Sequence, residues 1–209
     1  MKRFIPILFA VFALAACEKE PDTDKLDNEY LVYTNYDKDC DFSNFQTYYV
    51  PDSILYINSN DKKEYWQSEA AQVVLSEYIK NMDERFLRVD NIADADLGLQ
   101  LSYVANTYTF TDFVGDPWWS GYPYYWSPGY WGGYWGGLYY PFPIVYSYST
   151  GSIIGELVDL SVPEGKTLNV VWNSYISGLL YNNGRLNLEK AQNAIDQAFR
   201  QSTYLNSIK

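Results

Sequence analysis

The sequence contains no histidine and has only two cysteines, Cys17 and Cys40. Without histidine, the chain lacks the commonest general base and the commonest zinc ligand of proteins. It also lacks the Ser-His and Cys-His pairs in which a neighbouring base activates a nucleophile. Any acid–base chemistry would therefore have to rest on carboxyl groups.

Positive charge is also scarce, since 15 Lys and Arg residues stand against 26 Asp and Glu residues and the net charge is −11. The compact basic spots are Lys62 with Lys63 and Arg85 with Arg88, all in one predicted helix. Binding to a phosphate backbone requires clustered Lys and Arg side chains. We therefore expect no nucleic-acid partner.

The long apolar run near the start of the chain extends from Phe4 to Ala16 and follows Lys2 and Arg3. A helix that spans a bilayer needs about 20 apolar residues, so this run is too short. A basic start, a short apolar run and small residues before Cys17 are typical of a secretory signal peptide. We predict that residues 1–16 are such a peptide.

The segment Leu14-Ala15-Ala16-Cys17 resembles the lipobox of bacterial lipoproteins. The resemblance implies that Cys17 carries a diacylglyceryl group and becomes the first residue of the mature chain. Two or three acyl chains such as palmitate would hold the protein on a bilayer almost permanently, whereas one chain binds marginally. We therefore expect a lipid-anchored protein of the outer membrane, in the cell envelope.

Residues 18–29 carry six acids and two lysines, with Leu26 as the one apolar side chain apart from a proline. Such a segment buries too little surface to offset the entropy lost on ordering. We predict that residues 17–29 form a lipidated acidic tether. In some Gram-negative phyla such a stretch resembles an export signal to the outer face, but a solvated linker explains the same residues. The periplasmic and cell-surface faces both stay open.

Cys40 has no intramolecular partner once Cys17 carries lipid. Its thiol is then either buried and inert or available to another chain, and burial is the favoured interpretation.

Residues 30–209 have the length of a single domain, in which residues 115–143 form an aromatic insertion. Short strands are predicted at Val32–Asn35 and Thr47–Val50, with a turn at Asp41, Ser43 and Asn44 between them. Leu97, Leu99, Leu101 and Tyr103 alternate with polar residues, which predicts a strand with one face covered and the other toward solvent. Gly151–Leu180 is interpreted as a hairpin with its turn at Pro163–Lys166, and Leu168, Val170, Trp172 and Ile176 line one face of its second arm.

Two helices are predicted from apolar residues at helical spacing. The first covers residues 63–88, with Asn60 or Asp61 as its cap and Trp66, Ala70, Val74, Tyr78, Met82 and Phe86 in one stripe. The second contains Leu188, Ala191, Ile195, Ala198 and Phe199, with Asn187 as its cap. Two helices and a series of hairpins favour an α+β fold, with a mainly antiparallel sheet and both helices packed on one face. Trp66 and Trp172 are assigned to the core.

The order of these motifs resembles the DUF4136 family of envelope lipoproteins. The resemblance rests on YDKDCDFSNFQTYYVPDS, ADADLGLQLSY, GELVDL, NVVWNSYISGLL and a closing AQNAIDQAFR helix. The family carries the name domain of unknown function, so the resemblance implies no established activity. The usual Leu-Val-Trp-Arg-Gly of the hairpin is Val-Val-Trp-Asn-Ser here, which weakens any role for a basic residue at Asn173.

Three groups of acids are the raw material for catalysis: Asp37, Asp39 and Asp41; Asp94 and Asp96; Glu156 and Asp159. A glycosidase needs two carboxyl groups that face one another about 5–10 Å apart. Turn-forming aspartates and solvated strand faces explain all three groups, and the Gly and Glu of a calcium loop are missing. We expect no catalytic residue, no metal, no cofactor and no enzyme activity.

The stretch Gly115–Pro143 has five of the seven tryptophans of the chain, seven glycines and five prolines. Its Gly and Pro content argues against a continuous helix and a central strand, so we expect a loop or a small irregular sheet. Three interpretations stay open: the stretch completes the core or remains a poorly ordered low-complexity loop; it places rings at a bilayer interface; or it stacks rings on the sugars of a glycan or peptidoglycan. The predicted ligand or membrane contacts are Trp118, Trp119, Trp126, Trp131, Trp135, Tyr124, Tyr125, Tyr130 and Tyr134.

The sequence thus predicts a membrane-anchored envelope lipoprotein that acts as a non-catalytic binding or structural module. The alternative is a surface carbohydrate-binding accessory lipoprotein that uses the aromatic loop. The partners expected are the membrane, through the N-terminal lipid, and a glycan, peptidoglycan or envelope protein.

Overall fold

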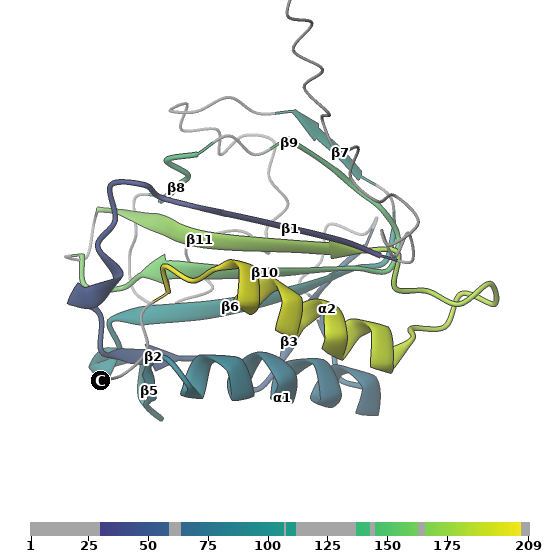
Figure 1. The fold of residues 1–209 in the computed structure, drawn as a ribbon, viewed down its shortest axis with the longest axis horizontal. Coiled ribbons are helices and arrows are strands. Elements are labelled where there is room, and N and C mark those ends of the chain that lie inside the picture. Colours follow the sequence, from purple (N-terminus) through teal and green to yellow (C-terminus); the bar gives the residue numbers. More distant parts are fainter. Residues whose placement is uncertain are drawn as a thin grey trace, which may run out of the picture.

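The computed structural model describes residues 30–58, 64–106, 108–111, 137–142, 145–162 and 166–205. The predicted signal peptide, the acidic tether and the turn residues 163–165 lie outside these ranges, as do Cys17 and all nine predicted aromatic contact residues. The described part contains one large sheet, a separate two-stranded sheet and two α-helices (Figure 1).

Four long strands dominate the large sheet: β1 (Leu31–Tyr36), β11 (Thr167–Ser177), β10 (Ser152–Asp159) and β6 (Leu97–Val104), in this spatial order. Two short strands pair with different parts of β6: β2 with its beginning and β3 with its end. Beyond them, β5 pairs with β2 and β4 pairs with β3. At the other side of the sheet, β8 pairs with β11. The bounds of the short strands are β2 Thr47–Tyr49, β3 Ile54–Ile57, β4 Glu64–Trp66, β5 Leu87–Arg88 and β8 Gly137–Tyr139. The small sheet pairs β7 (Tyr108–Thr111) with β9 (Val145–Tyr148).

The α+β class is confirmed, but the prediction of a mainly antiparallel sheet is wrong, because the sheet is mixed. The neighbours β1–β11, β11–β10 and β10–β6 are antiparallel, as the predicted hairpin requires. However, β2 and β3 both run parallel to β6, and β8 runs parallel to β11. Parallel pairing needs a crossover connection, and here α1 lies in the connection between β3–β4 and β6.

Both helices, α1 (Glu69–Asp83) and α2 (Leu188–Gln201), pack on one face of the sheet and run side by side (Figure 1). Val74 and Tyr78 of α1 and Ile195 and Phe199 of α2 are fully or almost fully buried. They meet Trp172 of β11 in the main hydrophobic cluster. We call this the helix face of the sheet.

The first helix begins later than predicted. Its N-cap is Ser68, whose side chain accepts a hydrogen bond from the backbone N–H of Ala71. Trp66 therefore lies in β4, which pairs with β3, and its ring stacks on Tyr103 at 4.4 Å between centroids. The predicted apolar stripe continues through Met82, whereas Phe86 is buried just beyond the end of the helix. The cap predicted for α2, Asn187, is confirmed.

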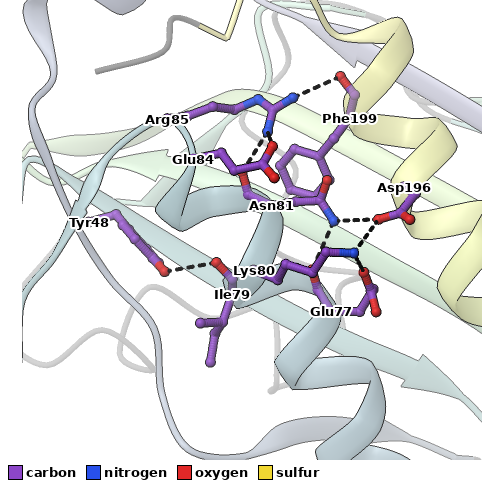
Figure 2. A network of polar contacts seen from close by, with 9 residues as sticks. All are labelled: Tyr48, Glu77, Ile79, Lys80, Asn81, Glu84, Arg85, Asp196 and Phe199. Carbon is purple, nitrogen blue, oxygen red and sulfur yellow. Dashed lines mark hydrogen bonds and ion pairs between the residues drawn. The ribbon is translucent and has the colours of Figure 1, made fainter. Parts of the chain in front are cut away.

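A polar cluster joins the two helices at the surface (Figure 2). Lys80 forms ion pairs with Glu77 at 2.5 Å and with Asp196 at 3.5 Å. Asn81 donates to Asp196 at 2.8 Å, and Gln192 donates to Glu77 at 2.9 Å. Because Asp196 of α2 contacts Lys80 and Asn81 of α1, and Glu77 of α1 contacts Gln192 of α2, this cluster fixes the position of α2 along α1.

The second arm of the hairpin changes face part-way along its length. The register shifts between Leu157, opposite Trp172, and Val158, opposite Val170. Val171 is the extra residue of this β-bulge. Trp172 and Ile176 therefore lie on the helix face, while Leu168 and Val170 lie in a second cluster on the opposite face. The prediction that all four line one face is wrong for this reason.

Cys40 is half-buried and packs against the main cluster. Burial, together with the nearby carboxylates of Asp37, Asp159 and Asp41, raises the pKa of its thiol to about 12. A thiol in this environment is a poor nucleophile, which agrees with the interpretation of an inert side chain.

Neither helix in the described ranges has the length and apolar character needed to cross a membrane.

Gly155 of β10 is where α1 approaches the sheet most closely. A Cβ atom at this position would lie 2.6 Å from Tyr78 Cε1 and 2.8 Å from Ser174 Oγ. Tyr78 is fully buried and cannot move aside. We therefore expect Gly155→Ala to lower the free energy of unfolding by about 1–3 kcal/mol in urea titrations.

The double variant Gly155→Ala, Tyr78→Leu provides the control, because the smaller side chain makes room for the methyl group. Its loss of stability should be smaller than the sum of the two single losses. If the loss in the double variant equalled the sum of the two single losses, the close approach of Tyr78 to Gly155 would be contradicted.

Candidate binding face

The face of the sheet opposite the helices, which we call the open-side face, carries polar side chains in its interior. Side chains alternate along a strand, so Leu99, Leu101, Ile153 and Leu157 point to the helix face. The residues between them, which include Gln100, Ser102 and Glu156, point to the open-side face. The strand prediction placed them in solvent, but this is wrong, because Gln100 and Ser102 are each 1% exposed.

Three polar side chains lie next to one another on three neighbouring strands. The register places Gln100 of β6 opposite Glu156 of β10, and Glu156 opposite Asn173 of β11. Gln100 Nε2 donates to Glu156 Oε2 at 3.1 Å. We call Gln100, Glu156 and Asn173 the polar row.

Tyr140 covers the polar row on the open-side face. Its hydroxyl donates a hydrogen bond to Glu156 Oε1 at 2.8 Å. It follows β8, which pairs with the first part of β11. Leu138 and Phe142, on either side of Tyr140, pack with Val158 in the second hydrophobic cluster. Residues 137–142, the last part of the aromatic stretch, thus cross the open-side face and contribute to its core.

Glu156 is 3% exposed, and burial raises the pKa of its carboxyl to about 7. Hydrogen bonds from Tyr140, Asn173 and Gln100 act in the opposite direction but do not cancel the cost of burial. Within the described ranges no basic side chain forms an ion pair with Glu156. The polar row is therefore held together by neutral donors.

Two oxygens near the polar row have no hydrogen-bond partner in the described part of the chain: Gln100 Oε1 and Ser102 Oγ. A buried polar atom without a partner costs about 1–3 kcal/mol. Such atoms are normally satisfied by a bound water or a ligand. The open-side face is thus the more polar and the less satisfied of the two interiors.

A hydroxyl cluster lies on the same face, around Tyr175 of β11. Its hydroxyl accepts hydrogen bonds from the backbone N–H of Ser149 at 3.2 Å and from Ser152 Oγ at 3.1 Å. Burial alone would raise the pKa of Tyr175, but these hydrogen bonds outweigh it and lower the pKa. The cluster ties β11 to the turn that precedes β10.

Among the described residues, the acids singled out from the sequence form no cluster that could hold a metal ion, although Asp37, Asp41 and Asp159 all lie near Cys40. Asp41 caps the 3-10 helix Phe42–Asn44 by accepting from Ser43 N, and Asp37 accepts from Asp39 N. Asp96 accepts from the backbone of Gln46 and Thr47, so it fixes β2 beside β6. Asp159 accepts from Ser161, two residues farther along, and does not contact Glu156.

The polar row was missed in the sequence, because polar residues that alternate with leucines were assigned to solvent. One signal was available. Glu156 lies within residues 153–158 of the predicted hairpin, where every other residue is apolar or glycine. A charge in such a strand indicates a buried carboxyl with dedicated donors.

The architecture defines an α+β protein with a mixed sheet, two helices on one face and a partly polar interior on the other. A family model described as "Domain of unknown function (DUF4136)" matches residues 32–202. The chain belongs to this family, as the sequence motifs indicated. None of the curated proteins matches it.

A solved structure of a DUF4136 family protein from Bacteroides thetaiotaomicron is similar, with 46% identity and a TM-score of 0.75. The match covers 86% of this chain and 99% of that one. A PDZ domain protein from Parabacteroides distasonis matches with 14% identity and a TM-score of 0.40, over 84% of this chain and 36% of that one.

The pKa of Glu156 makes stability depend on pH. In the unfolded chain this carboxyl ionises near pH 4.5, whereas in the fold it holds its proton up to about pH 7. Its contribution to stability is therefore fully present below pH 4.5 and is lost as the pH rises through 7. The total loss is about 3 kcal/mol.

Glu156→Gln removes this titration. The free energy of unfolding of the variant, relative to the parent, should rise between pH 5 and pH 8 in urea titrations. Glu189→Gln, on an exposed part of α2, is the matched control. A difference between Glu156→Gln and the parent that stays constant across this range would contradict a buried carboxyl at position 156.

Proposed function

We propose that the protein is an envelope lipoprotein, anchored to the outer membrane by a lipid on Cys17, whose folded part is a non-catalytic binding module. The aromatic stretch 115–143 is its contact region. The ligand is either the bilayer interface or, in the second candidate, the carbohydrate of the cell envelope.

The observation that carries this proposal is the position of residues 137–142. Their pairing through β8 and the contact of Tyr140 with Glu156 attach the end of the aromatic stretch to the open-side face. The helix face is occupied by α1 and α2. The described end of the stretch, residues 137–142, is thus held on the side of the sheet away from the helices. Tyr139, beside this attachment, keeps 38% of its surface exposed.

The surroundings of the acids support a non-catalytic role. Three of the acids accept hydrogen bonds from backbone N–H groups and thereby stabilise turns or strand positions: Asp37, Asp41 and Asp96. Glu156 has a pKa suited to proton transfer, but it is closed off beneath Tyr140. A general base must come within hydrogen-bonding distance of its substrate.

The anchor is tested by Cys17→Ala in the full chain. The variant cannot receive the diacylglyceryl group, so it should leave the membrane fraction and cease to incorporate radiolabelled palmitate. Cys40→Ala is the matched control and should stay in the membrane fraction with its label. Palmitate incorporation in the Cys17→Ala variant would refute the anchor.

The contact region is tested on a chain that begins at residue 18, since residues 1–17 lie outside the described fold. It should co-sediment with phosphatidylethanolamine vesicles or with insoluble cell-wall material. Trp118→Ala with Trp119→Ala should weaken the binding by about tenfold, because large exposed rings supply most of such contacts.

Trp66→Phe is the matched control, because that ring stacks on Tyr103 inside the sheet region. Sedimentation with vesicles would favour a bilayer contact, and sedimentation with wall material would favour the carbohydrate candidate. Binding in neither assay would contradict the role of the aromatic stretch.

A further inference from the structure

A tight turn between β11 and α2 projects from the body of the protein beyond the end of the sheet (Figure 1). Its base is a bridge between Leu180 and Leu186. Tyr181 N donates to Arg185 O and Gly184 N donates to Tyr181 O, both at 2.8 Å. We call residues 181–186 the tip.

The backbone of the tip is held in one conformation. Asn183 Oδ1 accepts from the N–H of Arg185 at 3.1 Å, and Gly184 has a φ of +77°, which glycine adopts without strain. Asn-Gly is the pair that a tight turn of this kind prefers. Turn chemistry therefore explains Asn183 and Gly184, but not their neighbours.

Tyr181, Asn182 and Arg185 have no structural task in the described part of the chain. Tyr181 is 54% exposed, and residues 182–185 are exposed as well. The ring of Tyr181 and the guanidinium of Arg185 form no hydrogen bond, ion pair or ring contact with described residues. Their side chains are thus available to a ligand.

These side chains line an open hollow on the surface of about 580 Å³, whose described lining residues are Tyr181, Asn182, Asn183, Arg185 and Leu186. The described lining residues supply one aromatic ring, two amides, one guanidinium and the side chain of Leu186, and none of them is a carboxylate. An aromatic ring packs on the C–H face of a sugar. Amide groups donate to and accept from adjacent hydroxyls, and a guanidinium group donates to them.

We propose that the tip binds a hydroxyl-rich oligosaccharide, with Tyr181 as the stacking platform and Arg185, Asn182 and Asn183 as the polar contacts. A stable protein interface needs about 800 Å² from each partner, which a single turn does not offer. Nucleic acid is disfavoured by the net charge of −11. Residues 137–142, the described part of the aromatic stretch, do not line the hollow.

This inference rests on the proposed binding role in the envelope but not on the aromatic stretch. The test uses the detergent-solubilised full chain and three probes: chitotriose and mannotriose by calorimetric titration, and peptidoglycan sacculi by co-sedimentation. The two trisaccharides distinguish an N-acetylated sugar of the wall from a neutral hexose of another envelope glycan.

Tyr181→Ala and Arg185→Gln should each weaken binding by about tenfold or more, because each removes a main contact. Tyr181→Phe keeps the ring and should retain most of the affinity. Arg88→Gln, at an exposed position of β5, should bind like the parent chain. All four variants should unfold at the temperature of the parent chain, since these side chains hold no part of the fold.

The proposal is overturned if the parent chain binds none of the three probes, or if Tyr181→Ala and Arg185→Gln bind like the parent. If binding is lost with Trp118→Ala and Trp119→Ala but not with the tip variants, carbohydrate binding stands while the tip site fails. If sacculi are bound only before protease treatment, the partner is a protein, and the oligosaccharide proposal fails.

Discussion

The structure depends on the pairing of β6, β10 and β11, because this three-stranded core is buried on both faces. The eight residues of β6 and of β10 are almost all buried. Neither face of such a strand is exposed to solvent. Its polar side chains are therefore buried and need hydrogen-bond partners within the protein. The register that brings Gln100, Glu156 and Asn173 together is the consequence.

The helix face and the open-side face of the sheet bury different kinds of side chain. On the helix face, apolar side chains of both helices and the sheet interdigitate, and Gly155 lets Tyr78 approach the backbone. Trp172 adds one buried donor, which Ser202 satisfies at 3.0 Å. On the open-side face a buried carboxyl is satisfied by neutral donors, one of which arrives with the end of the aromatic stretch. The second face is therefore linked to the segment that we assign to ligand contact, and the first face is not.

Much of the fold could be predicted from periodicity, since the strands at residues 97–104 and 152–177 and both helices follow simple apolar patterns. The errors have physical causes. Trp66 fits a helical stripe, but Ser68 offers a better cap and β3 offers a strand partner for residues 64–66. Leu168 and Val170 of β11 lie on the other face from Trp172 because Val171 is one extra residue in the strand. No local sequence pattern predicts this bulge. Parallel pairing of β2 and β3 with β6 depends on crossover connections, which alternation within a strand does not reveal.

The candidate sites divide in the same way. The lipobox cysteine and the aromatic stretch are visible in the sequence, because their composition is unusual, and their roles stay predictions. The polar row was invisible, because a polar residue that faces a second interior follows the same alternation as one that faces water. The tip was missed because its exposed tyrosine and arginine look ordinary until their lack of described partners is seen.

The open-side face is a closed interior, in which residues 137–142 cover Glu156. The most direct test is the carboxyl ¹³C chemical shift of Glu156 followed by NMR through a pH titration. A midpoint near pH 7 is the result expected for a carboxyl buried among neutral donors. A midpoint near 4.5, the ordinary value for glutamate, would mean that water reaches the polar row, and the closed open-side face would be wrong.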